Sequence, residues 1–226
     1  MNKIETMLRL QQELNDNTNG KGWESGITQN GKVIDWRRCI WLEAAELVES
    51  YPWKHWKNID AKADYDNIKI EAVDIWHFVM SEALRLYAID DLGDISDLTK
   101  AITSTGAYGD FVAGVRPVTE SYYDEVREVE QMVGLLFGEA SVERWTAQFY
   151  RVALIAGLDL DTLYELYIGK NILNRFRQDH GYKDGTYIKI WNGQEDNAVM
   201  QEILASNEVI TPEELYDRLV VHYSAI

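Results

Sequence analysis

The chain has 226 residues, of which 46% are hydrophobic and 27% charged, so it can bury a sizeable core and does not have the composition of a disordered protein. Its formal net charge of −16 opposes binding to nucleic acid or to anionic membranes through a general basic surface. Its single cysteine, Cys39, excludes an intramolecular disulfide and a cysteine-based metal site. No apolar run is long enough to span a bilayer. We expect a globular, cytoplasmic protein that binds neither nucleic acid nor membrane.

Helices should dominate, because only three prolines interrupt the chain. Helical spacing of apolar residues predicts helices near residues 3–15, 36–50, 60–89, 121–137, 141–157 and 160–178. Residues 90–120 are richer in Gly, Asp, Ser and Thr, which favours loops and short helices. A capping box at residues 211–214 predicts one more helix. We therefore expect a single all-α domain over residues 1–226, a helical bundle with a helical insertion or mobile part at about residues 90–140.

Acidic residues recur every three positions on two neighbouring predicted helices. Glu43, Glu46 and Glu49 share one side of the first helix, and Glu71 and Asp74 pair likewise on the next. Two carboxylates about 4 Å apart repel by roughly 4 kcal/mol at an effective dielectric near 20. Unless some are protonated, such a cluster needs divalent cations, and oxygen-only ligands favour Mg²⁺, with Mn²⁺ as a substitute, over Zn²⁺.

Two other interpretations of these acidic residues stay open. A lone Glu-x-x-Glu is commonly just a solvated acidic face, although the apolar neighbours Trp41, Leu47 and Trp76 argue against that here. A ferritin-like iron site would want Glu-x-x-His on two helices, whereas the chain offers a single Asp74-Ile-Trp-His77.

Residues 169–189 gather cations, amides and tyrosines in an otherwise acidic chain. On the predicted helix, Lys170, Asn174 and Arg177 fall at i, i+4 and i+7 and make one polar stripe. Because Arg binds phosphate oxygens by bidentate hydrogen bonds and Lys by its point charge, the stripe predicts a phosphate site. A basic helix end that complements the helix dipole is the alternative explanation for Arg177. After Gly181 we expect a loop that can fold back over the ligand.

Amides and aromatic rings elsewhere are candidates for contact with a nucleobase. Gln11 and Asn15 are spaced i, i+4 on the first predicted helix, and Trp23 follows it. Amides can read the edge of a base and an indole can stack on its face. Phe78 comes four residues after Asp74, so it could abut a base beside the metal site; a core aromatic is the alternative.

Taken together, these motifs resemble those of the dimeric dUTPases, a branch of the all-helical nucleoside triphosphate pyrophosphohydrolases that includes the MazG-like enzymes. The matching stretches are Leu10-Gln11, Leu14-Asn15, EAAELVESYPWKHWK at 43–57, EAVDIWHF at 71–78 and KNILNRFRQDHGYKDGTYIK at 170–189. Where the family usually has Trp-Lys-Trp-Trp-Lys, the chain has WKHWK at 53–57, which leaves the exact wall of the pocket open. Residues 190–226 match no motif.

The resemblance implies a Mg²⁺-dependent homodimer that hydrolyses dUTP, and also dUDP, to dUMP through attack by a metal-activated water. Such an enzyme limits uracil incorporation into DNA and supplies dUMP. The implied metal ligands are Glu43, Glu46, Glu71 and Asp74, and the implied catalytic residues are Glu49, as general base or water-orienting group, and Glu46. The implied nucleotide contacts are Gln11, Asn15, Trp23, His77, Phe78, Lys170, Asn174, Arg177, Tyr182, Lys183, Tyr187 and Lys189. No organic cofactor is implied.

Two rival functions stay open at this point. One is a related all-helical pyrophosphohydrolase that acts on another nucleotide, such as dCTP. The other is a non-enzymatic acidic helical binding protein, which the net charge of −16 would suit. A panel of nucleotide substrates separates all three.

Overall fold

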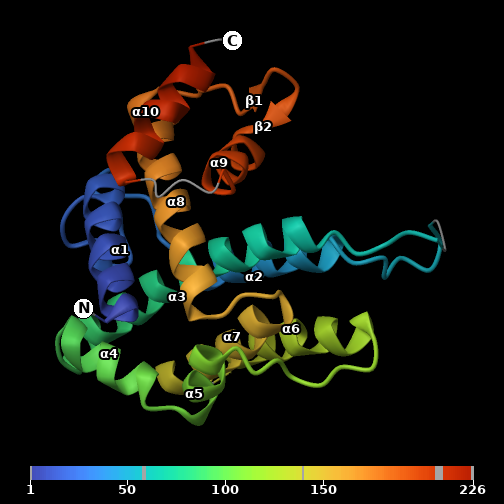
Figure 1. Cartoon of the computed structure of the whole chain (residues 1–226). Helices are drawn as coiled ribbons and strands as arrows, with labels where there is room; N and C mark the ends of the chain where they lie inside the picture. Colours follow the sequence, from blue (N-terminus) through green and yellow to red (C-terminus); the bar gives the residue numbers. More distant parts are fainter. Residues whose placement is uncertain (1, 58–59, 139, 207–210, 225–226) are drawn as a thin grey trace. The chain divides into compact units, whose positions relative to one another are not determined.

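The structure is a computed structural model of the chain that describes every residue except 1, 58–59, 139, 207–210 and 225–226 (Figure 1). Helices make up most of the described residues, and the regular strands among them are β1 (Ile190–Trp191) and β2 (Gln194–Glu195), which form one small antiparallel hairpin. The predicted all-α fold is confirmed. Within these same ranges, no helix combines the length and the apolar character that a membrane span requires.

Two compact units make up the chain, Met1–Tyr164 and Glu165–Ile226. This division does not decide whether the units are separate domains. The single domain expected from the length of the chain therefore stays a prediction. The first unit contains α1 (Lys3–Asn19), the 3-10 helix η1 (Trp23–Ser25), α2 (Trp36–Glu49), α3 (Tyr65–Ile89), α4 (Ile95–Thr103), α5 (Gly106–Ala113), α6 (Tyr122–Leu136), α7 (Val142–Ile155) and the first turn of α8 (Leu160–Asp179).

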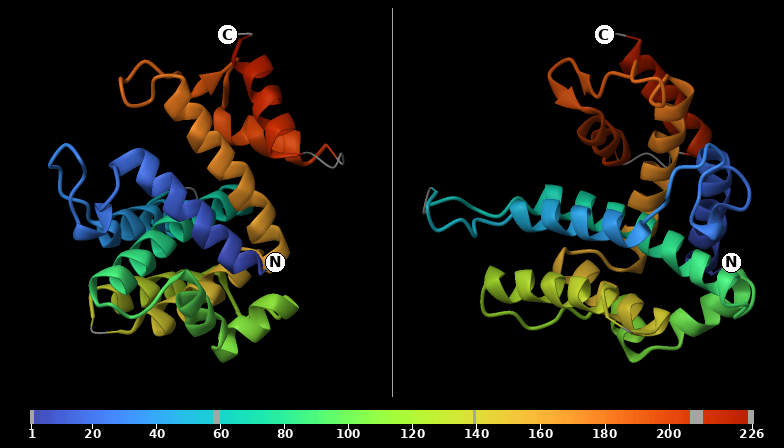
Figure 2. Two further views of the ribbon diagram at one scale, coloured as in Figure 1. Left: turned by 90° about the vertical axis from the view of Figure 1, so that its left-hand side faces the viewer. Right: turned by 180° about the vertical axis from the view of Figure 1, so that it is seen from behind.

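Two helix pairs organise the first unit. α2 lies along α3, and α6 lies along α7, as both views of Figure 2 show. α2 also contacts α6, so the pairs pack on each other, while α1 packs on α3 and α4. The α2–α3 pair therefore stands between α1 on one side and α6 on the other.

Local sequence signals set the ends of α2 and α3. The side chain of Asp35 caps α2 by accepting a hydrogen bond from the backbone N–H of Arg38, and Pro52 follows the end of the helix. Asp64 caps α3 in the same way by accepting from the backbone N–H of Asn67. α3 consequently begins at Tyr65, later than the predicted start near residue 60.

The α2–α3 contact buries an apolar face on each helix. Ala44 and Leu47 of α2 and Ala72 and Ile75 of α3 are all buried. Helix separation depends on the side chains at the contact, so the two alanines permit a close approach. Glu43 and Glu71 each directly precede one of these alanines, which places both carboxylates at the seam between the helices.

Residues 90–120 form the short helices α4 and α5 with connecting loops, as the composition of this stretch predicted. Asp94 and Asp97 make a capping box at the start of α4, and Thr105 caps α5. α5 packs against α7, so this stretch is part of the first unit. Motion of residues 90–140 stays a prediction.

The second unit has a hydrophobic core of its own. From Glu165 onward it comprises most of α8, the β1–β2 hairpin, α9 (Asp196–Leu204) and α10 (Pro212–Tyr223). The core contains Ile172, Leu173, Phe176, Trp191, Val199, Met200, Ile203, Leu215 and Leu219. α10 begins with the predicted capping box of Thr211 and Glu214. Residues 190–226, which matched no motif, thus supply most of the core that packs around α8.

Candidate functional site

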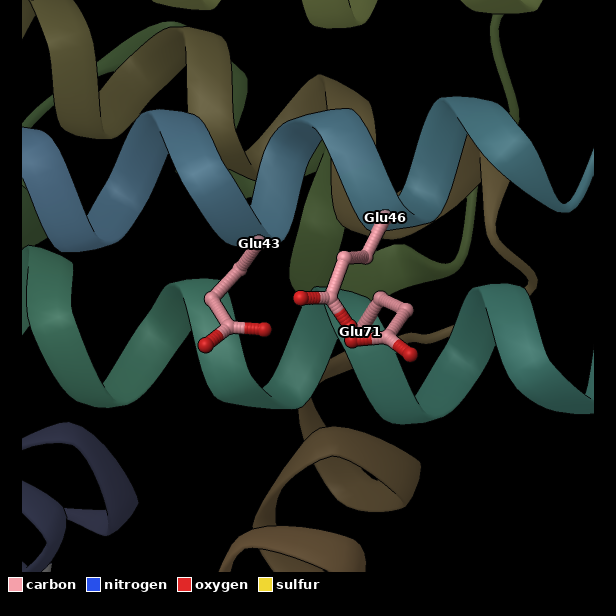
Figure 3. Close-up of side chains that lie close together, drawn as sticks. All are labelled: Glu43, Glu46 and Glu71. Atoms are coloured by element: carbon pink, nitrogen blue, oxygen red, sulfur yellow. The ribbon is translucent and has the colours of Figure 1, made fainter.

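Three of the four predicted metal ligands come together between α2 and α3 (Figure 3). Glu43 and Glu46 project from α2 and Glu71 from α3, and one carboxylate oxygen of each lies within 4.8 Å of the others. Glu71 is buried, Glu43 half-buried and Glu46 exposed. Two ionised carboxylates at this separation repel by roughly 3 kcal/mol at an effective dielectric near 20, before solvent screening. An oxygen-only set of this kind fits a hard divalent cation.

Asp74, the fourth predicted ligand, lies one turn beyond Glu71 on α3 and is half-buried. The tight cluster found among the described residues is formed by Glu43, Glu46 and Glu71, and Asp74 is not part of it. The assignment of Asp74 to the metal site therefore stays a prediction.

An amide that the sequence motifs did not single out supports the buried member of the cluster. Asn67 donates from Nδ2 to Oε1 of Glu71 at 3.2 Å and to Oγ of Ser50 at 2.8 Å. These bonds tie the carboxylate of Glu71 to the residue that follows α2. The signal in the sequence was the i, i+4 spacing of Asn67 and Glu71 on one helix.

A cavity of about 530 Å³ opens beside the carboxylate cluster. Its charged and amide-bearing lining comprises Glu46, Glu49, Lys54, Lys57, Lys62, Asp64, Asn67 and Glu71. Glu49, the predicted general base, thus shares a cavity with two predicted metal ligands, and its carboxylate forms an ion pair with Lys54. Carboxylates and ammonium groups around one cavity suit a ligand that combines a cation with phosphates. Lys62 belongs to none of the recognised motifs.

The segment after α2 carries an aromatic cluster next to this cavity. The ring of Trp56 lies edge-on to Trp53, with ring centroids 5.6 Å apart, and edge-on to His55, with centroids 4.8 Å apart. The imidazole of His55, which stands where the resemblance places a third indole, therefore packs against Trp56.

The predicted nucleoside contacts from α1 and α3 form one buried polar network. Nε2 of Gln11 donates to Oδ1 of Asn15 at 3.2 Å and to Oγ of Ser81 at 3.1 Å. Nδ2 of Asn15 donates to the same hydroxyl at 3.0 Å, and Oε1 of Gln11 lies 2.8 Å from Nδ1 of His77. Since the Gln11 oxygen can only accept, Nδ1 of His77 carries the proton.

The predicted stacking residues, Trp23 and Phe78, lie in an aromatic cluster formed by η1, α2 and α3. Trp23 is fully buried, and its indole N–H donates to Oδ1 of Asp16 at 3.1 Å. Its ring meets Trp36 edge-on at 5.7 Å, and Phe78 stacks on Trp36 at 5.9 Å. Contact of these residues with a nucleobase stays a prediction, because in this structure they pack against one another.

In the second unit, the predicted phosphate-binding arginine meets a carboxylate. Arg177 donates from Nε to Oδ2 of Asp196 and from Nη2 to Oδ1, both at 2.8 Å. The hydroxyl of Tyr187 donates to Oδ2 of the same residue at 2.8 Å. Burial raises the pKa of Asp196, but the hydrogen bonds and charge of Arg177 outweigh burial and hold that pKa below its ordinary value.

The second unit also holds the other nucleotide contacts predicted in this stretch. Lys170 donates to Oδ1 of Asn197 at 2.7 Å, and Nη1 of Arg177 donates to Oδ1 of Asn174 at 3.2 Å. The remaining three, Tyr182, Lys183 and Lys189, are exposed. The guanidinium of Arg177 and the ammonium of Lys189 lie 6.0 and 5.7 Å from the ring centroid of Tyr182. All seven residues of the predicted set thus lie in one compact unit.

The sequence model of the dUTPase family matches residues 3–182, which is well over half of the chain. The chain belongs to the all-α dUTPase family. Members of this family are dUTP diphosphatases, so the predicted enzyme class is confirmed. The predicted metal ligands and Glu49 all fall inside the matched range, whereas Lys183, Tyr187, Lys189 and Asp196 lie beyond it. A comparison with curated proteins gave no match.

Proposed function

We propose that the chain hydrolyses dUTP to dUMP and pyrophosphate with Mg²⁺, or Mn²⁺ in its place, held by Glu43, Glu46 and Glu71, with Asp74 as a fourth ligand. The observation that carries this proposal is the cluster of three carboxylates on facing helices in a chain of the dUTPase family. When bound, the metal would supply neutralisation of phosphate charge and activation of a water molecule.

Residues of the adjoining cavity have separate tasks in the proposed reaction. Glu49 orients the attacking water and accepts its proton, because its carboxylate lines the same cavity as Glu46 and Glu71. Lys54, paired with Glu49, keeps that carboxylate in the cavity. Lys57 and Lys62 face the phosphates and stabilise the negative charge that builds up on the leaving group.

Deoxyuridine is assigned to the polar network of α1 and α3. Glutamine and asparagine side chains offer both a donor and an acceptor, which matches the alternating polar edge of uracil. On binding, Gln11 and Asn15 would exchange their bonds with Ser81 for bonds with the base. His77, Trp23 and Phe78 complete this set of proposed nucleoside contacts. Further proposed contacts with base, sugar and phosphates are Lys170, Asn174, Arg177, Tyr182, Lys183, Tyr187 and Lys189.

We also propose dUDP as a substrate, because a metal cluster centred on the two inner phosphates does not require a third phosphate. The reaction would limit uracil incorporation into DNA and supply dUMP. The single cysteine suits the reducing cytoplasm as the place of action.

A homodimer is the proposed assembly, with a second copy covering an apolar groove between α2 and α6. The groove, of about 480 Å³, is lined mainly by apolar side chains and reaches Glu46 and Glu49. Trp41 and Leu42, at its edge, are 40% and 45% exposed in the single chain. Large exposed apolar side chains in contiguous patches are typical of subunit interfaces.

The test is pyrophosphate release from dUTP, dCTP and dTTP, each with Mg²⁺ and with excess EDTA. We expect release from dUTP that requires Mg²⁺ and little from the other two. Faster release from dCTP would instead identify a related pyrophosphohydrolase, and no release from any nucleotide would leave the chain without the proposed activity.

The metal site is tested in the same assay with Glu46→Gln, which keeps the size of the side chain but removes its charge. We expect kcat to fall by at least about a hundredfold with unchanged helical content, because a cation ligand is lost. Glu13→Gln, at an exposed position on α1, is the control and should keep full activity. If Glu46→Gln kept the kcat of the wild type, the assignment of Glu46 as a metal ligand would be wrong.

A further inference from the structure

Two residues beyond the family match hold several of the residues assigned to the nucleotide. Asp196 accepts two hydrogen bonds from Arg177 and one from Tyr187, all at 2.8 Å. Its backbone N–H donates to the carbonyl oxygen of Lys189 at 2.9 Å. Asn197 accepts from Lys170 at 2.7 Å and from Arg177 at 3.3 Å.

The β1–β2 hairpin places these two residues. Its turn is formed by Asn192 and Gly193, whose φ values of 50° and 90° are those of a tight two-residue hairpin. Trp191 is buried against Phe176, with ring centroids 5.7 Å apart, and so anchors the first strand to α8. The second strand runs directly into Asp196 at the start of α9, which puts its carboxylate opposite Arg177.

The geometry of the pair leaves one side of the arginine facing another assigned residue. Asp196 engages the Nε and Nη2 edge of the guanidinium, whereas Nη1 lies toward Asn174, with a separation of 3.2 Å between Nη1 and Oδ1. A phosphate contacted through Nη1 and Asn174 would therefore meet an arginine whose plane is already set. An arginine that is oriented before binding loses less freedom when its ligand arrives.

The burial of Asp196 and Arg177 indicates whether the carboxylate orients the arginine or competes with phosphate for it. Asp196 is 1% exposed and Arg177 is 8% exposed. If phosphates displaced the carboxylate, Asp196 would become a buried charge without its partner, beside an anionic ligand, which is unfavourable. If the ion pair stays intact while Arg177 binds phosphate, Asp196 keeps its partner and this unfavourable free energy does not arise.

We propose that Asp196 and Asn197 are positioning residues for the phosphate-binding side chains Arg177 and Lys170. This inference rests on the proposed function for the role of those two cations, and it adds to the site a segment that the family match does not include.

The experiment measures binding to the full-length protein in excess Mg²⁺ by calorimetry. The probes are α,β-imido-dUTP, inorganic tripolyphosphate and deoxyuridine, which carries no phosphate. The variants are Asp196→Asn, which removes the charge at constant size, and Asn197→Ala, which leaves the buried ion pair intact. Asp179→Asn is the matched control, since this exposed carboxylate of α8 also accepts a tyrosine hydroxyl, that of Tyr216 at 2.8 Å, but belongs to no assigned site.

We expect Asp196→Asn to weaken binding of both phosphate probes by about tenfold or more, and Asn197→Ala by about threefold or more. Deoxyuridine binding should change by less than about twofold in either variant, because it makes no phosphate contact. In an Arg177→Gln background, Asp196→Asn should add less than about twofold, since Asp196 acts through the arginine. Asp179→Asn should bind all three probes like the wild type.

Each other outcome overturns the inference. Tighter binding of the phosphate probes by Asp196→Asn would make the carboxylate a competitor of phosphate. Equal weakening of all three probes, or unchanged binding in both variants, would make these residues purely structural or irrelevant. If Asp196→Asn does not fold, Asn197→Ala decides alone. Failure of the proposed function appears separately, as a wild type that binds the phosphate probes but does not release pyrophosphate from dUTP.

Discussion

At the scale of single residues, the partners of a buried carboxylate indicate whether it is held in an ion pair or is suited to bind a cation. Glu82 is 1% exposed and accepts hydrogen bonds from Arg37 at 2.8 Å and Arg85 at 2.7 Å. Asp196 is likewise held by an arginine. Glu71 is buried too, but it lies beside two further carboxylates, and repulsion of this kind favours a bound cation. Glu82 and Asp196 are thus each held in an ion pair, whereas Glu71 is suited to bind a cation.

The ion pair of Asp196 predicts a specific response of stability to acid. Because its pKa is lowered in the folded protein, the ionised carboxylate stabilises the fold above the ordinary value of 3.8, and this contribution is lost as the pH falls through the lowered pKa. Wild type should therefore exceed Asp196→Asn in unfolding free energy at neutral pH, and the difference should shrink below pH 3.8. Urea unfolding at a series of pH values measures it. A difference that does not vary with pH would contradict the lowered pKa.

Residue spacing predicted which candidate site residues lie together when they belong to the same helix. Glu43 and Glu46 share one face of α2 because they are three residues apart, and Gln11 and Asn15 meet because they are four apart. The same reasoning could not find Asp196, which stands 19 positions after Arg177 and reaches it only through the hairpin turn. Contacts made across a turn leave no periodic trace in the sequence.

At the scale of elements, the helices were predictable from apolar spacing, and their ends depended on caps. α10 begins where its capping box stands, whereas α3 begins later than predicted because Asp64, and not an earlier residue, caps it. The strands β1 and β2 have two residues each, too few for an alternating pattern to be visible. The Asn192-Gly193 pair was their only local signal.

The α2–α3 contact should control stability and activity together. Leu47 is 1% exposed on α2, next to Glu46, so Leu47→Ala leaves a cavity at the seam. We expect the unfolding free energy to fall by about 2–5 kcal/mol. The Mg²⁺ concentration required for half-maximal activity should rise, because the two helices that carry the carboxylates are held together less firmly.

Leu92→Ala serves as the control for this element, since Leu92 is exposed. Its unfolding free energy should change by no more than about 0.5 kcal/mol. Denaturant unfolding and Mg²⁺ titration of dUTP hydrolysis measure the two effects. Equal stability of both variants would show that the seam does not hold the fold together.

At the scale of the whole molecule, the net charge of −16 and a polyphosphate substrate repel each other. The described structure counters this locally, with Lys54, Lys57 and Lys62 around the carboxylate cavity and a separate group of cations on the second unit. Composition predicted the repulsion. It could not predict the local compensation, which depends on which side chains the fold gathers.

The proposed homodimer makes a prediction about the size of the particle. Wild type should sediment at twice the 26.1 kDa of the chain. Trp41→Asp places a charge in the apolar groove and should shift the particle to the mass of one chain at micromolar concentration. Val221→Asp, at an exposed position of α10, is the control and should remain dimeric. A wild type that sediments as a single chain would refute the assembly.

The aromatic packing around Phe176 bears on how the protein can be divided. This ring lies inside the family match, which ends at residue 182, yet its neighbours Trp191, Tyr216 and Tyr223 come after that point, with ring centroids 5.4 to 5.7 Å away. A gene shortened at residue 182 would leave α8 with a bare aromatic face and Arg177 without its carboxylate. The end of the family match is thus a poor place to truncate the protein, and a shortened protein should retain residues 183–224.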